Sequence, residues 1–137
     1  MNIIRPIQPD DYESLYGIAN ASGVGFTSLP VNKELLTSKI KKSVNSFKQQ
    51  VTQPGDESYL FVMEDTQTKQ VVGTSGIVAS VGLDDPFYHY HQSKVVHASQ
   101  ELDIYNTVDI LTLCNDYTGV SEICTLFLMP EARCGLN

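Results

Sequence analysis

The first fifty residues combine one short apolar run with two stretches of helical spacing. Residues 3–7 form the apolar run, which predicts a first strand. Pro9, followed by two aspartates, predicts a helix over residues 9–21 that Gly23 ends. Asn32 is expected to cap a second helix, because the apolar residues after it recur every three or four positions and form one stripe. That stripe consists of Leu36, Ile40, Val44, Phe47 and Val51.

The rest of the chain has the pattern of short strands. Residues 59–63 and 71–81 read as two strands joined by the polar turn 65–70, which predicts a hairpin. Three further short strands are expected at residues 95–99, 109–113 and 123–129. This order predicts an α+β fold in which two helices pack on a mainly antiparallel sheet.

Composition indicates one folded domain. The 137 residues are 42% hydrophobic and 18% charged, which suits a buried core and argues against disorder. The chain has no signal-peptide pattern and no apolar run of the ~20 residues needed to span a membrane. We therefore expect a cytoplasmic protein without a membrane partner.

Charge bears on the class of ligand. The net charge is −7, and residues 51–137 hold three Lys/Arg against twelve Asp/Glu. This acidity disfavours nucleic acid as a partner and suits a cationic small substrate, although solubility alone explains many acidic surfaces.

Cysteines and histidines give no strong chemical motif. Cys114, Cys124 and Cys134 form no C-x-x-C pair, which argues against a disulfide framework and a structural zinc site. In an extended segment His89 and His91 would point to the same face, but a metal needs a further ligand, so no metal site is predicted. A cysteine nucleophile paired with a histidine stays open as an alternative without local support.

Two segments could contact a ligand. Gly23 and Gly25 lie in a loop that suits either substrate contact or a plain turn between helices. The pair resembles half of a dinucleotide fingerprint, but it follows a helix, which excludes that interpretation. The aromatic stretch 86–91 could line a pocket, bury an interface or cover a sheet edge.

Five stretches together resemble the arginine N-succinyltransferase family, in the order in which the family has them. They are 4–6 (IRP), 23–32 (GVGFTSLPVN), 81–90 (VGLDDPFYHY), 96–105 (VHASQELDIY) and 115–130 (NDYTGVSEICTLFLMP). The resemblance covers nearly the whole chain, which makes it more specific than any single motif.

The resemblance implies a fold and an activity. It implies the N-terminal half of a GNAT-like acyl-CoA N-acyltransferase that transfers succinyl from succinyl-CoA to the α-amine of L-arginine, in arginine catabolism. Succinyl-CoA would be a co-substrate, and no tightly bound cofactor is expected. Residues 123–129 would be the central strand, whose backbone holds the pantetheine arm. The residues expected to contact succinyl-CoA are Leu126, Phe127, Leu128 and Arg133, and those expected at the amino-acid substrate are Thr27, Ser28, Tyr88, Tyr90, Asn115 and Asp116.

The chain departs from the family's pattern at its last residues. Residues 133–137 read RCGLN, where the family continues with a Gly-Gly-Asn-Gly type of loop for the CoA pyrophosphate. We therefore expect residues 1–137 to be the N-terminal portion of the domain, truncated at that loop. The family's catalytic histidine would lie beyond residue 137, and no histidine of this chain is expected to replace it.

Two questions stay open at this point. An inactive truncated domain could instead act through self-association, as a homo-oligomer, or through pairing with a separate C-terminal chain. The exposed edge of the strand 123–129 would invite that pairing. The acceptor amine could also be ornithine rather than arginine.

Overall fold

The computed structural model describes residues 1–133 and divides them into two compact units. One unit is Met1–Ser80 with the residues from Ser121 on, and the other is Val81–Val120. The first unit contains β1 (Asn2–Pro6), the 3-10 helix η1 (Pro9–Asp11), α1 (Tyr12–Ser22), α2 (Lys33–Ser46), β2 (Ser58–Asp65), β3 (Val71–Val78), β6 (Glu122–Leu128) and the 3-10 helix η2 (Pro130–Ala132). The second unit contains β4 (His89–Ser99) and β5 (Ile104–Cys114).

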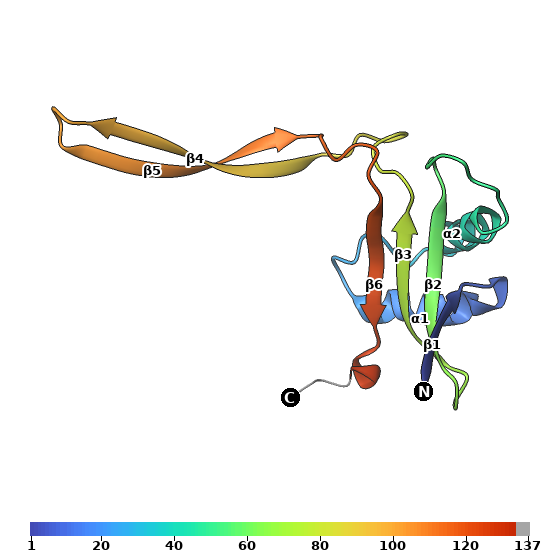
Figure 1. Ribbon diagram of the computed structural model, residues 1–137. Helices are drawn as coiled ribbons and strands as arrows, with labels where there is room; N and C mark the ends of the chain where they lie inside the picture. Colours follow the sequence, from blue (N-terminus) through green and yellow to red (C-terminus); the bar gives the residue numbers. More distant parts are fainter. Residues whose placement is uncertain (134–137) are drawn as a thin grey trace. The chain divides into compact units, whose positions relative to one another are not determined.

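The first unit is an antiparallel sheet covered by two helices. Its strands lie in the order β1-β2-β3-β6, and every neighbouring pair is antiparallel. Figure 1 shows α1 and α2 on the same face of this sheet. The core between the helices and the sheet consists of Ile7, Leu15, Ile18, Ala19, Leu29, Leu36, Ile40, Leu60 and Val62. The predicted α+β architecture is confirmed.

The helix boundaries follow their local signals, with one correction. Gly23 ends α1 with a φ of 75°, a left-handed conformation that glycine adopts without strain. The Asn32 side chain accepts a hydrogen bond from the Leu35 N–H at 3.0 Å, which caps α2 as predicted. The predicted stripe is wrong beyond Ser46, because α2 ends there and Val51 lies in an exposed segment.

The last packed residue of that stripe is Phe47, which contacts two aromatic rings of β2. Phe47, the residue after α2, packs edge-on against the rings of Tyr59 and Phe61 at centroid distances of 5.0 and 5.4 Å. The Oγ of Ser46 also accepts a hydrogen bond from the Ser58 N–H at 3.1 Å. These contacts fix the end of α2 against the start of β2, and the apolar stripe ends there.

The second unit contains a long two-stranded ribbon (Figure 1). β4 and β5 are paired over eleven residues each, from His89 opposite Cys114 to Ser99 opposite Ile104. The predicted strands 95–99 and 109–113 are therefore too short. Most side chains of both strands are exposed, so no alternation of apolar and polar residues marks the full length of these strands in the sequence.

Two smaller points complete the fold. β3 ends at Val78 rather than at residue 81: the Ala79 N–H still donates to the Glu57 carbonyl at 2.9 Å, but the Val81 N–H donates to the Val120 carbonyl, away from β2. Among residues 1–133, neither helix is long and apolar enough to cross a membrane. Residues 134–137, with Cys134, where the sequence is expected to depart from the family's phosphate-binding loop, lie outside the described residues.

Candidate functional site

A β-bulge interrupts β6 at the residues expected to contact succinyl-CoA. In the register, Gly76 faces Cys124 and Thr74 faces Phe127, so two residues of β6 lie opposite one residue of β3. The first of the two, Thr125, has a φ of 55°, which non-glycine residues rarely adopt. The second, Leu126, is 71% exposed. Bulges of this kind re-aim a side chain and end regular pairing, often beside a functional site.

Two glycines of β3 make room for the bulged strand. A Cβ at Gly73 would lie 2.9 Å from the Phe127 carbonyl oxygen, and one at Gly76 would lie 3.1 Å from the Cys124 sulfur. A side chain at Gly73 would collide with the β6 backbone, and one at Gly76 would require the Cys124 side chain to shift. The sequence showed the glycines but not this reason for them.

A pocket of about 450 Å³ lies beside the bulge. Cross-strand register puts Ile4, Met63, Gly73 and Leu128 in one row across the four strands of the sheet. The residues around the pocket are Ile4, Met63, Gly73, Thr74, Ser75, Leu126, Phe127, Leu128 and Arg133. All four residues predicted to contact succinyl-CoA therefore line one pocket.

The four residues differ in what they present to it. Leu126 offers an exposed apolar side chain, whereas the Phe127 ring packs against Phe26, with centroids 5.7 Å apart. The Arg133 Nε–H donates to the Leu128 carbonyl at 2.9 Å, and its guanidinium lies 5.3 Å from the centre of the Phe127 ring. Arg133 is thereby held at the end of β6 by its Nε, while its terminal nitrogens have no such bond among the described residues.

The residues predicted at the amino-acid substrate are distributed over both units. Thr27 and Ser28 follow α1 in the first unit, in the loop 23–32 that also holds the buried Leu29. Thr27 is exposed and Ser28 is half-buried. The glycine-containing loop therefore offers these two hydroxyl side chains beside a core residue.

The other four lie in the second unit. Tyr88 and Tyr90 are 59% and 65% exposed, at the start of β4. The Asn115 carbonyl accepts hydrogen bonds from the N–H and the Oγ1–H of Thr118, at 3.0 and 2.7 Å, so its backbone builds the turn after β5. An Asp116 carboxylate oxygen lies 3.1 Å from the Nε2 of His89.

That last contact belongs to a cluster that sequence reasoning missed. His89, Cys114 and Asp116 have their potential ligand atoms within 4.8 Å of one another. The sequence gives no direct signal, because His89 meets Cys114 only through the register of the ribbon.

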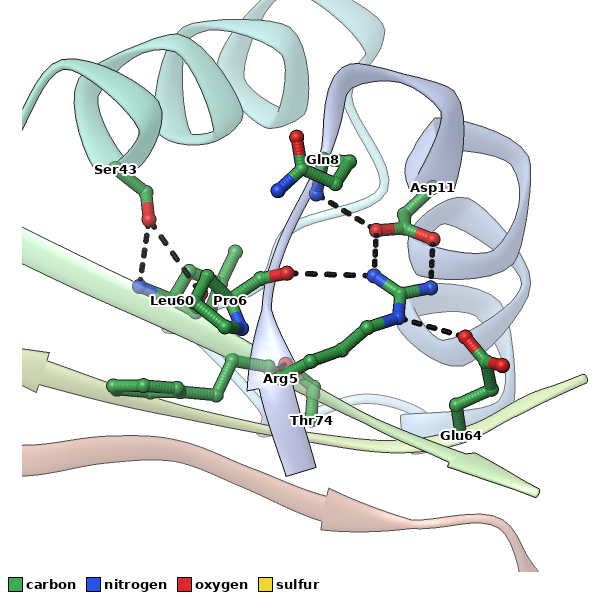
Figure 2. Close-up of polar contacts among 9 residues, drawn as sticks. Arg5, Pro6, Gln8, Asp11, Ser43, Leu60, Glu64 and Thr74 are labelled. Carbon is green, nitrogen blue, oxygen red and sulfur yellow. Dashed lines mark hydrogen bonds and ion pairs between the residues drawn. The ribbon is translucent and has the colours of Figure 1, made fainter. Parts of the chain in front are cut away.

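Hydrogen bonds to two carboxylates, first of all that of Asp11, raise the pKa of Arg5 and hold its side chain in the fold (Figure 2). Its guanidinium donates to both oxygens of Asp11 at 2.7 and 2.8 Å, and its Nε donates to Glu64 at 2.7 Å. Burial alone would raise the pKa of Asp11, but hydrogen bonds from Arg5 and the Gln8 N–H, with the charge of Arg5, lower it below its ordinary value. Arg5 thus joins β1, η1 and β2.

The fold and the bulged strand beside a pocket define the class of protein: a GNAT-like acyl-CoA N-acyltransferase fold. The family profile described as the arginine N-succinyltransferase beta subunit matches residues 2–137. The chain belongs to the arginine N-succinyltransferase family.

Individual relatives agree with this membership. An arginine N-succinyltransferase of Yersinia pestis (strain Pestoides F) is 44% identical over 95% of this chain and 37% of its own length. One of Salmonella schwarzengrund (strain CVM19633) is 43% identical over 97% of this chain and 38% of its own. The solved structure of arginine/ornithine succinyltransferase subunit AI from Pseudomonas aeruginosa matches with a TM-score of 0.82 and 41% identity, over 96% of this chain and 40% of that one. The chain therefore spans well under half the length of these relatives.

Proposed function

We propose that this chain forms part of an enzyme that transfers a succinyl group from succinyl-CoA to the α-amine of L-arginine. The neutral amine attacks the thioester carbonyl, a C–N bond forms, the C–S bond breaks, and the CoA thiolate leaves while the nitrogen loses a proton. The pocket beside the β6 bulge carries the proposal. All four residues expected to contact succinyl-CoA line this pocket, and the chain belongs to a family of succinyltransferases.

Succinyl-CoA is the expected co-substrate, and β6 is its expected support. The bulge leaves backbone groups of Thr125 and Leu126 out of the regular ladder with β3, where the amides of a pantetheine arm can pair with them. The exposed Leu126 side chain supplies apolar contact. Arg133, shortly after the same strand, suits an anionic phosphate group because its terminal nitrogens make no hydrogen bond among residues 1–133.

Six polar side chains are the candidates for contact with the amino-acid substrate. We assign this role to Thr27, Ser28, Tyr88, Tyr90, Asn115 and Asp116. The excess of carboxylates over basic residues in 51–137 suits a cationic acceptor. Ornithine, which is also cationic, is the alternative acceptor, and the Pseudomonas aeruginosa subunit is described for both amino acids.

Turnover tests the proposal. Residues 1–133 of this chain would replace the matching 37% of the Yersinia pestis relative, and thiol release from succinyl-CoA would be followed with L-arginine, with L-ornithine and without acceptor. We expect arginine-dependent release and N-succinylarginine as the product. A folded chimera that releases CoA at the same rate with and without either amino acid would contradict the proposed function.

A matched pair of variants tests the site within the chimera. Leu126→Arg should raise the KM for succinyl-CoA, because Leu126 lies at the bulge. Leu35→Arg on α2 is the control, since Leu35 is a 50% exposed leucine that lines none of that pocket. Equal KM values in the two variants would mean that Leu126 of β6 does not contact succinyl-CoA.

The free edge of β6 also suits a protein partner. In the described sheet β6 pairs only with β3, so its other edge can accept a further strand. We propose that this strand comes from a segment matching the remaining length of the relatives, or from a second copy of the chain. Light scattering that shows a monomer at every concentration would exclude the second copy.

A further inference from the structure

Three potential metal ligands meet where β4 begins and β5 ends. His89 and Cys114 are direct cross-strand partners, so their side chains share one face of the ribbon. Asp116 follows in the turn, with a carboxylate oxygen 3.1 Å from the Nε2 of His89. The ligand atoms of the three residues lie within 4.8 Å of one another, and none of the three lines the β6 pocket.

The histidine ring is already held in place. It stacks on the ring of Tyr117 at 4.1 Å between centroids and 21° between planes. The turn that carries Tyr117 and Asp116 is fixed by two hydrogen bonds from Thr118 to the Asn115 carbonyl, at 3.0 and 2.7 Å. Preorganised ligands lose less freedom when they bind an ion.

His89 presents its Nε2 to Asp116, whose carboxylate oxygen lies 3.1 Å away. Its Nδ1 is buried and has no hydrogen-bond partner among the described residues. An ion shared by His89 and Asp116 would bind Nε2, and Nδ1 would then carry the proton of the neutral ring.

We propose that His89, Cys114 and Asp116 bind a divalent ion of the zinc type, with water completing the coordination. An imidazole, a thiolate and a carboxylate together favour Zn²⁺ or Co²⁺ over Mg²⁺ and Ca²⁺, which prefer oxygen ligands alone. In a tetrahedral site the nitrogen and oxygen ligands lie about 3.3 Å apart, and the nitrogen and sulfur about 3.6 Å apart.

The structure is close to that spacing. The observed 3.1 Å between His89 and Asp116 already matches the first distance within the side-chain freedom of an exposed aspartate. The Cys114 sulfur, now 3.4 Å from the Thr112 carbonyl, lies within 4.8 Å of the other two ligand atoms. The bound ion would join β4 to the turn after β5 and so fasten the base of the ribbon.

Metal titration of the purified, metal-stripped 137-residue chain tests the proposal. We expect one Zn²⁺ per chain by calorimetry, an affinity that rises with pH because the thiol must lose its proton, and a thiolate-to-cobalt absorption band with Co²⁺. His89→Ala and Cys114→Ser should each lower the affinity more than about tenfold, since even outer-shell partners of metal ligands contribute about 10–100-fold.

Matched controls separate this site from general thiol or imidazole binding. His97→Ala changes a histidine on the same strand, about 26 Å along it at strand spacing. Cys124→Ser changes a thiol in β6. Both controls should bind Zn²⁺ like the unaltered chain.

Two results would overturn the proposal. One is a Zn²⁺ affinity that the His89 and Cys114 variants retain, with unchanged circular dichroism to show that they fold. The other is a Co²⁺ complex whose thiolate band survives Cys114→Ser.

Discussion

Replacing Arg5 with alanine should destabilise the first unit far more than loss of an exposed ion pair. The Arg5 side chain is 28% exposed, and those of its partners Asp11 and Glu64 are only 10% and 13% exposed. Without the guanidinium, two carboxylates stay largely buried and lose three short hydrogen bonds. Breaking a fully buried pair costs about 3–5 kcal/mol and an exposed one about 0–1, so we expect about 2–3 kcal/mol for this partly exposed network.

Urea unfolding at pH 7, followed by circular dichroism, measures this loss. Lys42→Ala is the control, because the Lys42 and Asp56 side chains are 48% and 71% exposed and their charges lie 3.6 Å apart. Its effect should stay within about 0.5 kcal/mol. Arg5→Lys should fall between the two, since lysine keeps the charge but not the two-pronged geometry. If Arg5→Ala lost no more stability than Lys42→Ala, the buried network around Arg5 would not stabilise the fold as proposed.

Three further predictions concern stability. The lowered pKa of Asp11 means that its charge contributes stability above about pH 4, and that this stability is lost as the pH falls through the folded-state pKa. Asp11→Asn should therefore weaken the pH dependence of the unfolding free energy below about pH 4. An unchanged pH dependence would contradict this. Ser43→Ala should cost about 1–3 kcal/mol in urea unfolding, because the buried Ser43 Oγ accepts the Leu60 N–H at 2.8 Å (Figure 2). Gly17→Ala, in an exposed helical position with open space around it, should stabilise the chain by about 0.5–1 kcal/mol. Gly73→Ala should destabilise it, because a Cβ there would meet a β6 carbonyl at 2.9 Å. The opposite order of melting temperatures would count against the close approach of β3 and β6.

The parts of the fold with one buried face could be predicted from the sequence. Leu36 and Ile40 occur at helical spacing because α2 packs on the sheet, and both are buried. The polar turn 65–70 joins β2 to β3 as expected. Local capping by Asn32 also worked, since it depends only on residues within one turn of the helix.

The features that depend on register could not be predicted. The ribbon of β4 and β5 has no buried face, so no alternation marks its length. The bulge at Thr125 requires an unusual backbone conformation that its residue type does not signal. The meeting of His89 with Cys114 follows from pairing between positions that are far apart in sequence.

For the candidate site, the resemblance named residues that the structure then brought together at β6. Leu126, Phe127, Leu128 and Arg133 share one pocket, although the Phe127 ring faces the core rather than solvent. Adjacent residues of one strand are easily placed together. The residues assigned to the amino-acid substrate come from distant segments of two units, and their assignment stays a prediction.

Two-dimensional NMR with ¹⁵N-labelled protein, a method that detects millimolar binding, can show directly whether β6 contacts succinyl-CoA. We predict saturable amide shifts concentrated in residues 124–128 and at Arg133. They should be weaker with free succinate than with CoA, and abolished by Leu126→Arg but not by Leu35→Arg. Shifts confined to other elements, or shifts at β6 that the Leu126 variant leaves unchanged, would contradict the claim that β6 holds the acyl donor.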